Sequence, residues 1–137
     1  GNVTPCVFVP FSPVNIKDVY AQGGNITDVF KTPFFADIRK WQTSTEKSNL
    51  LAPCLIRDHN DVLRQLICKH EAEPIDSSAA SSIQDGDYAT GLDAYSAEYQ
   101  VIADQVWEKA YLEGSPITQK EMKILTQEPE LAVLPVK

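Results

Sequence analysis

Four of the nine prolines in this chain directly follow a serine or a threonine. The pairs are Thr4-Pro5, Ser12-Pro13, Thr32-Pro33 and Ser115-Pro116. A hydroxyl side chain can accept a hydrogen bond from a free N–H at a helix start, and proline fits the first helical position because its missing N–H would have no partner there. Since the last three pairs open stretches with helix-like apolar spacing, we interpret them as helix starts.

These helix starts and the apolar spacing that follows them predict a mainly α fold, a small irregular multi-helix domain with about five helices of unequal length. Extended N- and C-terminal arms flank these helices and are candidates for minor β structure. We expect the helices at 12–22, 33–41, 59–72, 92–113 and from 116 onward.

Three of the expected helices have an apolar face, and we predict the aromatic face of the helix at 33–41 to be core rather than a ligand platform. In the helix at 59–72, Asp58 is placed to act as the cap. The longest helix carries polar residues opposite its apolar stripe. The faces are Phe34, Ile38 and Trp41; Val62, Leu63, Leu66 and Ile67; and Tyr95, Tyr99, Ile102, Val106 and Ala110, the last opposite Asp93, Gln100, Asp104 and Glu108.

The length of 137 residues predicts a single domain, 1–137, large enough for its own core. Composition changes at a stretch rich in Ser, Ala and Asp, which is typical of a flexible linker. The predicted parts are an N-terminal extended arm at 1–11, a helical subdomain at 12–75, a flexible linker at 76–87, a helical hairpin at 88–128 and a C-terminal arm at 129–137.

The net charge of −7 argues against nucleic acid as a main partner, because phosphate binding depends on Lys and Arg. No apolar run approaches the roughly 20 residues that span a bilayer, so we expect no membrane insertion. Three cysteines leave at least one unpaired, which favours a reducing environment or a virion over secretion. The triplets at Asn2 and Asn25 match the N-glycosylation pattern and favour secretion instead. Compartment, oligomeric state and partner identity stay open.

No residue pattern in the chain assigns a catalytic group, a cofactor or a metal. His59 and His70 are expected to face solvent on one helix, too far apart to share a metal ion. Asp87 and Glu98 have the spacing of the first and last ligands of a calcium loop, but Leu92 stands where such a loop needs glycine. We therefore predict that the protein is not an enzyme and holds no cofactor or metal.

The apolar arms carry the functional prediction, because arms of this kind can add strands to neighbouring proteins or lie in their grooves. We predict a non-catalytic structural or interaction protein, an accessory or minor subunit of a larger assembly such as a virion or multiprotein complex. The alternative for the arms is that they fold onto the chain's own core. The predicted partner-binding residues are Val7, Phe8, Val9 and Phe11 in the first arm and Leu131, Val133, Leu134 and Val136 in the second.

Two other classes of function stay open. The first is a small independent binding domain, secreted or not, with a pocket for a ligand or protein lined by Trp41, Tyr95, Tyr99 and Trp107. The second, less favoured, is an enzyme that uses a Cys, a His and an acidic residue brought together by folding. Cys68 and His70 lie close in sequence, but residues two apart lie on different faces of a helix.

Overall fold

The computed structural model describes residues 1–44 and 49–121, and helices dominate this part of the chain, which confirms the mainly α prediction. Two short strands, β1 (Phe11–Ser12) and β2 (Glu73–Pro74), pair antiparallel. The helices are α1 (Ile16–Ala21), α2 (Ile26–Val29), α3 (Pro33–Gln42), α4 (Asn60–His70), α5 (Ser77–Gln84) and α6 (Gly86–Trp107), which η1 (Glu108–Leu112) continues as a π-helical turn. In the described ranges, no helix has both the length and the apolar character needed to cross a membrane.

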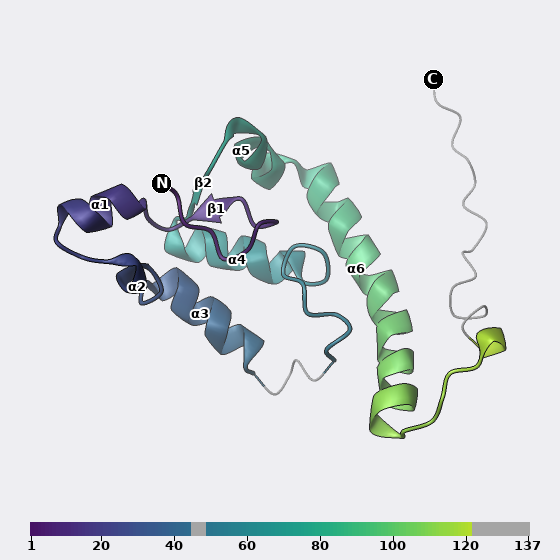
Figure 1. The fold of residues 1–137 in the computed structure, drawn as a ribbon. Coiled ribbons are helices and arrows are strands. Elements are labelled where there is room, and N and C mark those ends of the chain that lie inside the picture. The colour runs from purple at the N-terminus through teal and green to yellow at the C-terminus, as the bar shows by residue number, and fades with distance from the viewer. Residues whose placement is uncertain (45–48, 122–137) are drawn as a thin grey trace.

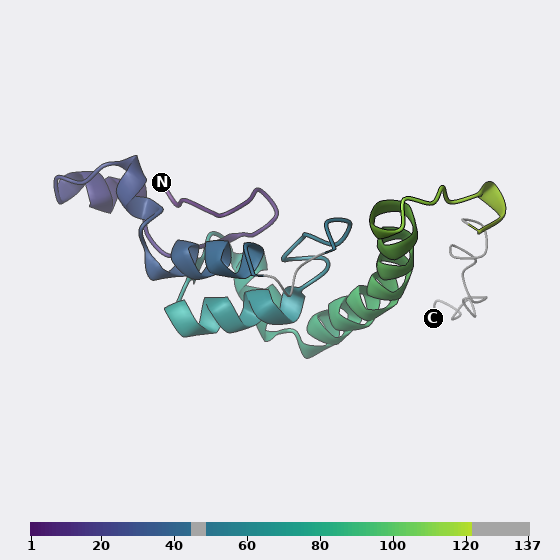
Figure 2. The ribbon, with the colours of Figure 1, turned by 90° about the horizontal axis from the view of Figure 1, so that it is seen from below.

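The hydrophobic core lies where α3, α4 and the N-terminal segment meet. Phe34 of α3, Leu63 of α4 and Val29 of α2 are its largest fully buried side chains. Figures 1 and 2 show α3 and α4 side by side, while α6 extends away from them. The faces predicted for α3 and α4 are confirmed as core, since Ile38 and Ile67 are also buried.

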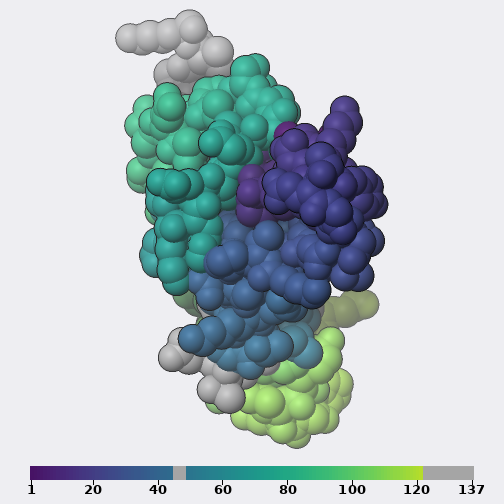
Figure 3. All heavy atoms as spheres, turned by 90° about the vertical axis from the view of Figure 1, so that its left-hand side faces the viewer, coloured from purple at the N-terminus to yellow at the C-terminus, as the bar shows by residue number. Residues whose placement is uncertain are grey.

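The N-terminal segment belongs to this core rather than to an independent arm. Val9 and Phe11 are buried, and Figure 3 shows purple atoms of this segment lodged between the blue α1–α2 part and the teal part of the chain. Strand β1 places Phe11 opposite Pro74 and Ser12 opposite Glu73. The segment is therefore fixed to the chain's own fold by burial and by backbone pairing.

The helix start predicted at Ser12-Pro13 is wrong. Ser12 is buried in β1, where its hydroxyl accepts from the Val3 N–H at 3.0 Å and lies 2.8 Å from the Val14 carbonyl. Helix α1 begins only at Ile16, after Asn15 has capped it by accepting from the Lys17 N–H. The hydroxyl is used to close a loop, so it cannot serve as a helix cap.

The other two helix starts differ in their outcome. Helix α3 begins at Pro33 as predicted, although the Thr32 hydroxyl donates to the Val29 carbonyl instead of capping the helix. The helix expected from 116 starts later, at residue 119, because Thr118 precedes it as a cap whose hydroxyl accepts from the Glu121 N–H, while the Glu121 carboxylate accepts from the Thr118 N–H. The remainder of that expected helix lies outside the described residues.

The predicted flexible linker at 76–87 is helical in the structure. Asp76 caps α5 by accepting from the Ala79 N–H at 2.8 Å, and Ala79 is buried. Asp85 caps α6 by accepting from the N–H groups of Asp87 and Tyr88, so α6 begins at Gly86 rather than at 92. Aspartates that looked like linker composition act as helix caps. The division of the chain into subdomains stays a prediction.

Candidate functional site

A loop at residues 49–59 lies between α3 and α4 in the chain and contacts α6, and a buried carboxylate fixes its shape. Asp58 accepts two hydrogen bonds from the Arg57 guanidinium, and the Cys54 N–H donates to the same carboxylate at 2.9 Å. The Asp58 side chain is fully buried, and its hydrogen bond raises the pKa of Arg57. The prediction that Asp58 caps the next helix is therefore wrong, because its carboxylate bonds to Cys54 and Arg57 within the loop and the cap residue of α4 is His59.

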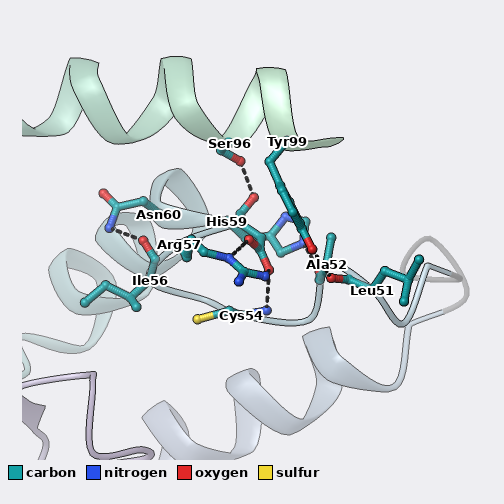
Figure 4. Close-up of polar contacts among 10 residues, drawn as sticks. Leu51, Ala52, Cys54, Ile56, Arg57, His59, Asn60, Ser96 and Tyr99 are labelled. Carbon is teal, nitrogen blue, oxygen red and sulfur yellow. Dashed lines mark hydrogen bonds and ion pairs between the residues drawn. The ribbon is translucent and has the colours of Figure 1, made fainter. Parts of the chain in front are cut away.

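Helix α6 is attached to this loop mainly by polar contacts. Ser96 donates its hydroxyl proton to the Asp58 carbonyl, and the Tyr99 hydroxyl donates to the Leu51 carbonyl at 2.9 Å. The guanidinium carbon of Arg57 lies 4.5 Å from the centre of the Tyr99 ring. Figure 4 shows Ser96 and Tyr99 reaching from α6 toward the loop.

Two further polar contacts lie on either side of these. Arg64 of α4 forms an ion pair with Asp93 of α6 at 2.7 Å. The amide of Asn49 donates to Asp104 at 2.7 Å. The polar face predicted for the long helix therefore faces the loop, while much of its apolar stripe is only partly covered.

Between the loop and α6 lies an open cavity of about 800 Å³, which we call the acidic cleft. Apolar and neutral groups such as Ala97, Gln100 and Trp107 form part of its wall. Among the described residues that line it there is no lysine or arginine. Its acidic lining residues are Asp58, Asp61, Asp93, Asp104 and Glu108.

The cleft also contains a serine, a histidine and an aspartate, but they do not form a catalytic relay. The Ser96 hydroxyl bonds to a backbone carbonyl, and the Asp58 carboxylate is held by Arg57. His59 Nε2 lies 2.8 Å from the Ala52 carbonyl oxygen, and the His59 ring packs against Trp41. In a Ser-His-Asp relay the histidine is hydrogen-bonded to the serine hydroxyl and the aspartate to the histidine. Ser96 instead joins α6 to the loop, whereas the Asp58 carboxylate and the His59 ring make their contacts within the loop and with Trp41 of α3.

The two histidines have structural partners, which corrects the prediction that they face solvent. His59 packs as described above, ahead of α4 rather than within it. His70 Nε2 lies 2.8 Å from Asp37 of α3, and its ring meets Phe34 edge-on. Hydrogen bonds from Lys69 and then His70 hold the pKa of Asp37 below its ordinary value.

No metal site emerges from residues 1–44 and 49–121, where no group of three His, Cys, Asp or Glu side chains could hold an ion. Asp87 and Glu98 both lie within α6, so the twelve residues of the calcium-loop alternative form a helix. That alternative is wrong. Cys6, Cys54 and Cys68 are all free thiols, and Cys54 is the one that is partly buried.

The predicted partner-binding residues of the first arm divide into two pairs. Val7 and Phe8 are 88% and 67% exposed, whereas Val9 and Phe11 are 2% and 4% exposed. A turn closed by the Val9 N–H and the Cys6 carbonyl at 3.0 Å places the exposed pair at its tip. The predicted residues of the second arm, Leu131, Val133, Leu134 and Val136, lie outside the described residues.

A second exposed apolar surface was not assigned from the sequence. It lies at the C-terminal end of α6 and in η1, where Val101, Tyr111 and Leu112 are each at least 60% exposed. The apolar spacing of this helix was recognised, but spacing alone does not say which positions a neighbour covers. The acidic cleft was missed for the same reason, although Asp93, Gln100, Asp104 and Glu108 were recognised as one polar face.

No protein-family model matches the chain, and comparisons with curated proteins and with solved structures found no match.

Proposed function

We propose that this protein is a non-catalytic interaction protein, an accessory or minor subunit of a larger protein assembly. The observation that supports the proposal is the exposure of large apolar side chains on two separate surfaces. One is the N-terminal tip, Val7 and Phe8, and the other is the α6 end, Val101, Tyr111 and Leu112. Exposed apolar clusters are characteristic of surfaces that contact other proteins.

The N-terminal tip is well suited to contact because the fold holds it in place. The residues on either side of the exposed pair are tied down, since Val9 is buried and its N–H closes the turn. An anchored aromatic side chain loses little conformational freedom when a partner covers it. A fixed tip of this kind favours binding to one specific partner surface over non-specific hydrophobic association.

The acidic cleft supports a second candidate, a small independent binding domain. Of the four aromatic residues predicted to line a pocket, Trp107 is in the wall of the cleft. Tyr99 instead contacts Arg57, Trp41 packs against His59, and Tyr95 is exposed and stacked on Tyr99. The cleft therefore differs from the predicted aromatic pocket, because its polar lining is mostly carboxylate.

Site-specific photo-crosslinking tests the proposed function. A benzophenone amino acid replaces Phe8 or Tyr111 in the full chain, expressed in its source cells, and Gln22 serves as an exposed control position. We expect the first two probes to capture defined proteins that the control does not capture. Reconstitution with the purified protein should then bind less tightly when Phe8→Ser is introduced. Equal capture at all three positions, together with a purified chain that binds no captured protein, would overturn the proposal.

A further inference from the structure

We infer that the acidic cleft binds a positively charged segment of a partner protein, one in which lysine or arginine stands beside an apolar side chain. This inference rests on the proposed function, because it assigns a partner chemistry to one surface of an interaction protein. The occupant is recognised by charge, by aromatic contact and by size, and each of these is visible in the cleft.

The charges in the cleft are only partly compensated. Arg57 neutralises Asp58, and Arg64 neutralises Asp93. Asp104 accepts from neutral amides, those of Asn49 and Gln100. Asp61 and Glu108 are exposed, and neither forms an ion pair with any other described residue.

Three carboxylates, those of Asp61, Asp104 and Glu108, therefore face the cleft without a cationic partner among the described residues. Complementary charge on a partner accelerates association and fixes its orientation. In the described part of the chain, these unpaired carboxylates gather around one cavity of about 800 Å³. Arginine and lysine are the side chains whose charge complements a carboxylate.

The aromatic wall of the cleft points to the same chemistry. Trp107 stacks on Tyr111, with ring centres 4.7 Å apart, and Glu108 stands between them in sequence. Cations bind to the faces of such rings, tryptophan most strongly. Leu112 adds an apolar contact at the same wall.

The size of the acidic cleft favours a protein segment over a metal ion as its occupant. A volume of about 800 Å³ is large enough for several side chains, and it lies within the range of cavities that hold whole ligands. The described carboxylates are spread along this cavity and do not form a group of three that could hold an ion. A basic segment with an apolar side chain uses both the carboxylates and the aromatic wall.

The test is an NMR titration of the isotopically labelled full chain with a peptide of repeating Lys-Leu-Leu-Lys, about twelve residues long, a length typical of segments bound in grooves. A peptide of the same length with Glu in place of Lys is the control ligand. We expect the basic peptide to shift the indole signal of Trp107 and the side-chain amide signals of Asn49 and Gln100. The acidic peptide should leave all three signals in place.

A matched pair of variants separates the cleft from the overall negative charge. Asp61→Asn with Glu108→Gln removes two cleft charges, and we expect a loss of affinity of about fivefold, since partly exposed charge pairs are weak. Asp18→Asn with Glu98→Gln removes two exposed charges outside the cleft, from the same residue types, and should leave the affinity unchanged. None of these four side chains has a hydrogen-bonded partner among the described residues, so both variants should unfold at the temperature of the wild type.

Two outcomes would overturn the inference. If both double variants lose affinity equally, the peptide is attracted by net charge and not by the cleft. If the cleft signals do not move, the assignment of a basic partner is wrong. In that second case, capture of a protein by the Phe8 probe would still uphold the proposed function, so the two failures can be told apart.

Discussion

Helices α4 and α6 both carry an apolar face, yet the fold covers them very differently. Helix α4 has 11 residues and buries Asn60, Leu63 and Ile67. Helix α6 has 22 residues and buries only Ala103. An apolar stripe in the sequence therefore shows that a helix can be covered on that side, but it does not show that the chain supplies the cover.

The two helices also differ in what attaches them. Helix α4 packs through Leu63 and Ile67 against Phe34 and its neighbours in the core. Helix α6 is joined to the loop by hydrogen bonds and to α4 by the Arg64–Asp93 ion pair, and Figure 2 shows it leaving the packed region. Because burial of apolar surface is the main source of stability, we expect the core to unfold last and α6 to detach first.

Two leucines allow the largest predicted effect to be measured with the same substitution. Leu63→Ala, at a position 2% exposed, should lower the free energy of unfolding by about 3 kcal/mol, because it leaves a cavity in the core. Leu112→Ala, at a position 68% exposed, should change it by less than about 0.5 kcal/mol. Urea unfolding followed by circular dichroism measures both. Similar losses at the two positions would show that η1, the continuation of α6, is packed as tightly as α4.

The second-largest loss of stability is expected from a substitution in the loop at 49–59, where the core meets α6. Asp58→Ala removes the acceptor for Arg57 and for the Cys54 N–H, and we expect a loss of about 2 kcal/mol, since a guanidinium and a part-buried backbone donor both lose their partner. Limited proteolysis should then cut α6 faster than α4. If both helices are cut at the same rate, this loop does not control the attachment of α6.

A smaller effect tests one polar contact of α6 by itself. Tyr99→Phe removes the hydroxyl that donates to the Leu51 carbonyl but keeps the ring beneath Arg57. We expect a loss of about 1 kcal/mol in urea unfolding, typical of one hydrogen bond. Tyr95→Phe is the control, because no hydrogen bond of the Tyr95 hydroxyl occurs within the described residues. A stability equal to the wild type for Tyr99→Phe would mean that the contact contributes nothing net.

The smallest effect lies between α3 and α4 and depends on pH. Hydrogen bonds from Lys69 and His70 lower the pKa of Asp37 in the folded state, so the ionised carboxylate stabilises the fold above its ordinary pKa of about 4. This contribution is lost as the pH falls through the lowered value. The stability advantage of the wild type over Asp37→Asn should therefore shrink from about pH 4 downward. An advantage that stays constant with pH would rule out this linkage.

The helical class and the core faces of α3 and α4 could be predicted from sequence because 3.6-residue spacing is a local property. The helix boundaries could not be predicted as well. Ser12 and Asp58 both have side chains suited to capping, but the fold uses each to close a loop. Asp76 and Asp85 looked like linker residues, but their carboxylates cap helices. A short polar side chain bonds whichever backbone group the tertiary structure brings near it.

The candidate sites show the same limit. The exposed pair Val7 and Phe8 belonged to the predicted arm, but the sequence did not separate them from the buried Val9 and Phe11. The acidic cleft joins residues of α6 with a loop much earlier in the chain, for example Asp104 with Asn49, which are 55 positions apart. No local pattern contains a pairing over such a distance.

The sequence by itself determined that this is an acidic, mainly helical chain, and it determined which sides of its helices are apolar. The tertiary structure decided which of those sides are covered and where the carboxylates of α6 meet the loop. The physical reason is that periodicity and charge are written into neighbouring residues, whereas burial and charge compensation depend on groups far apart in the chain.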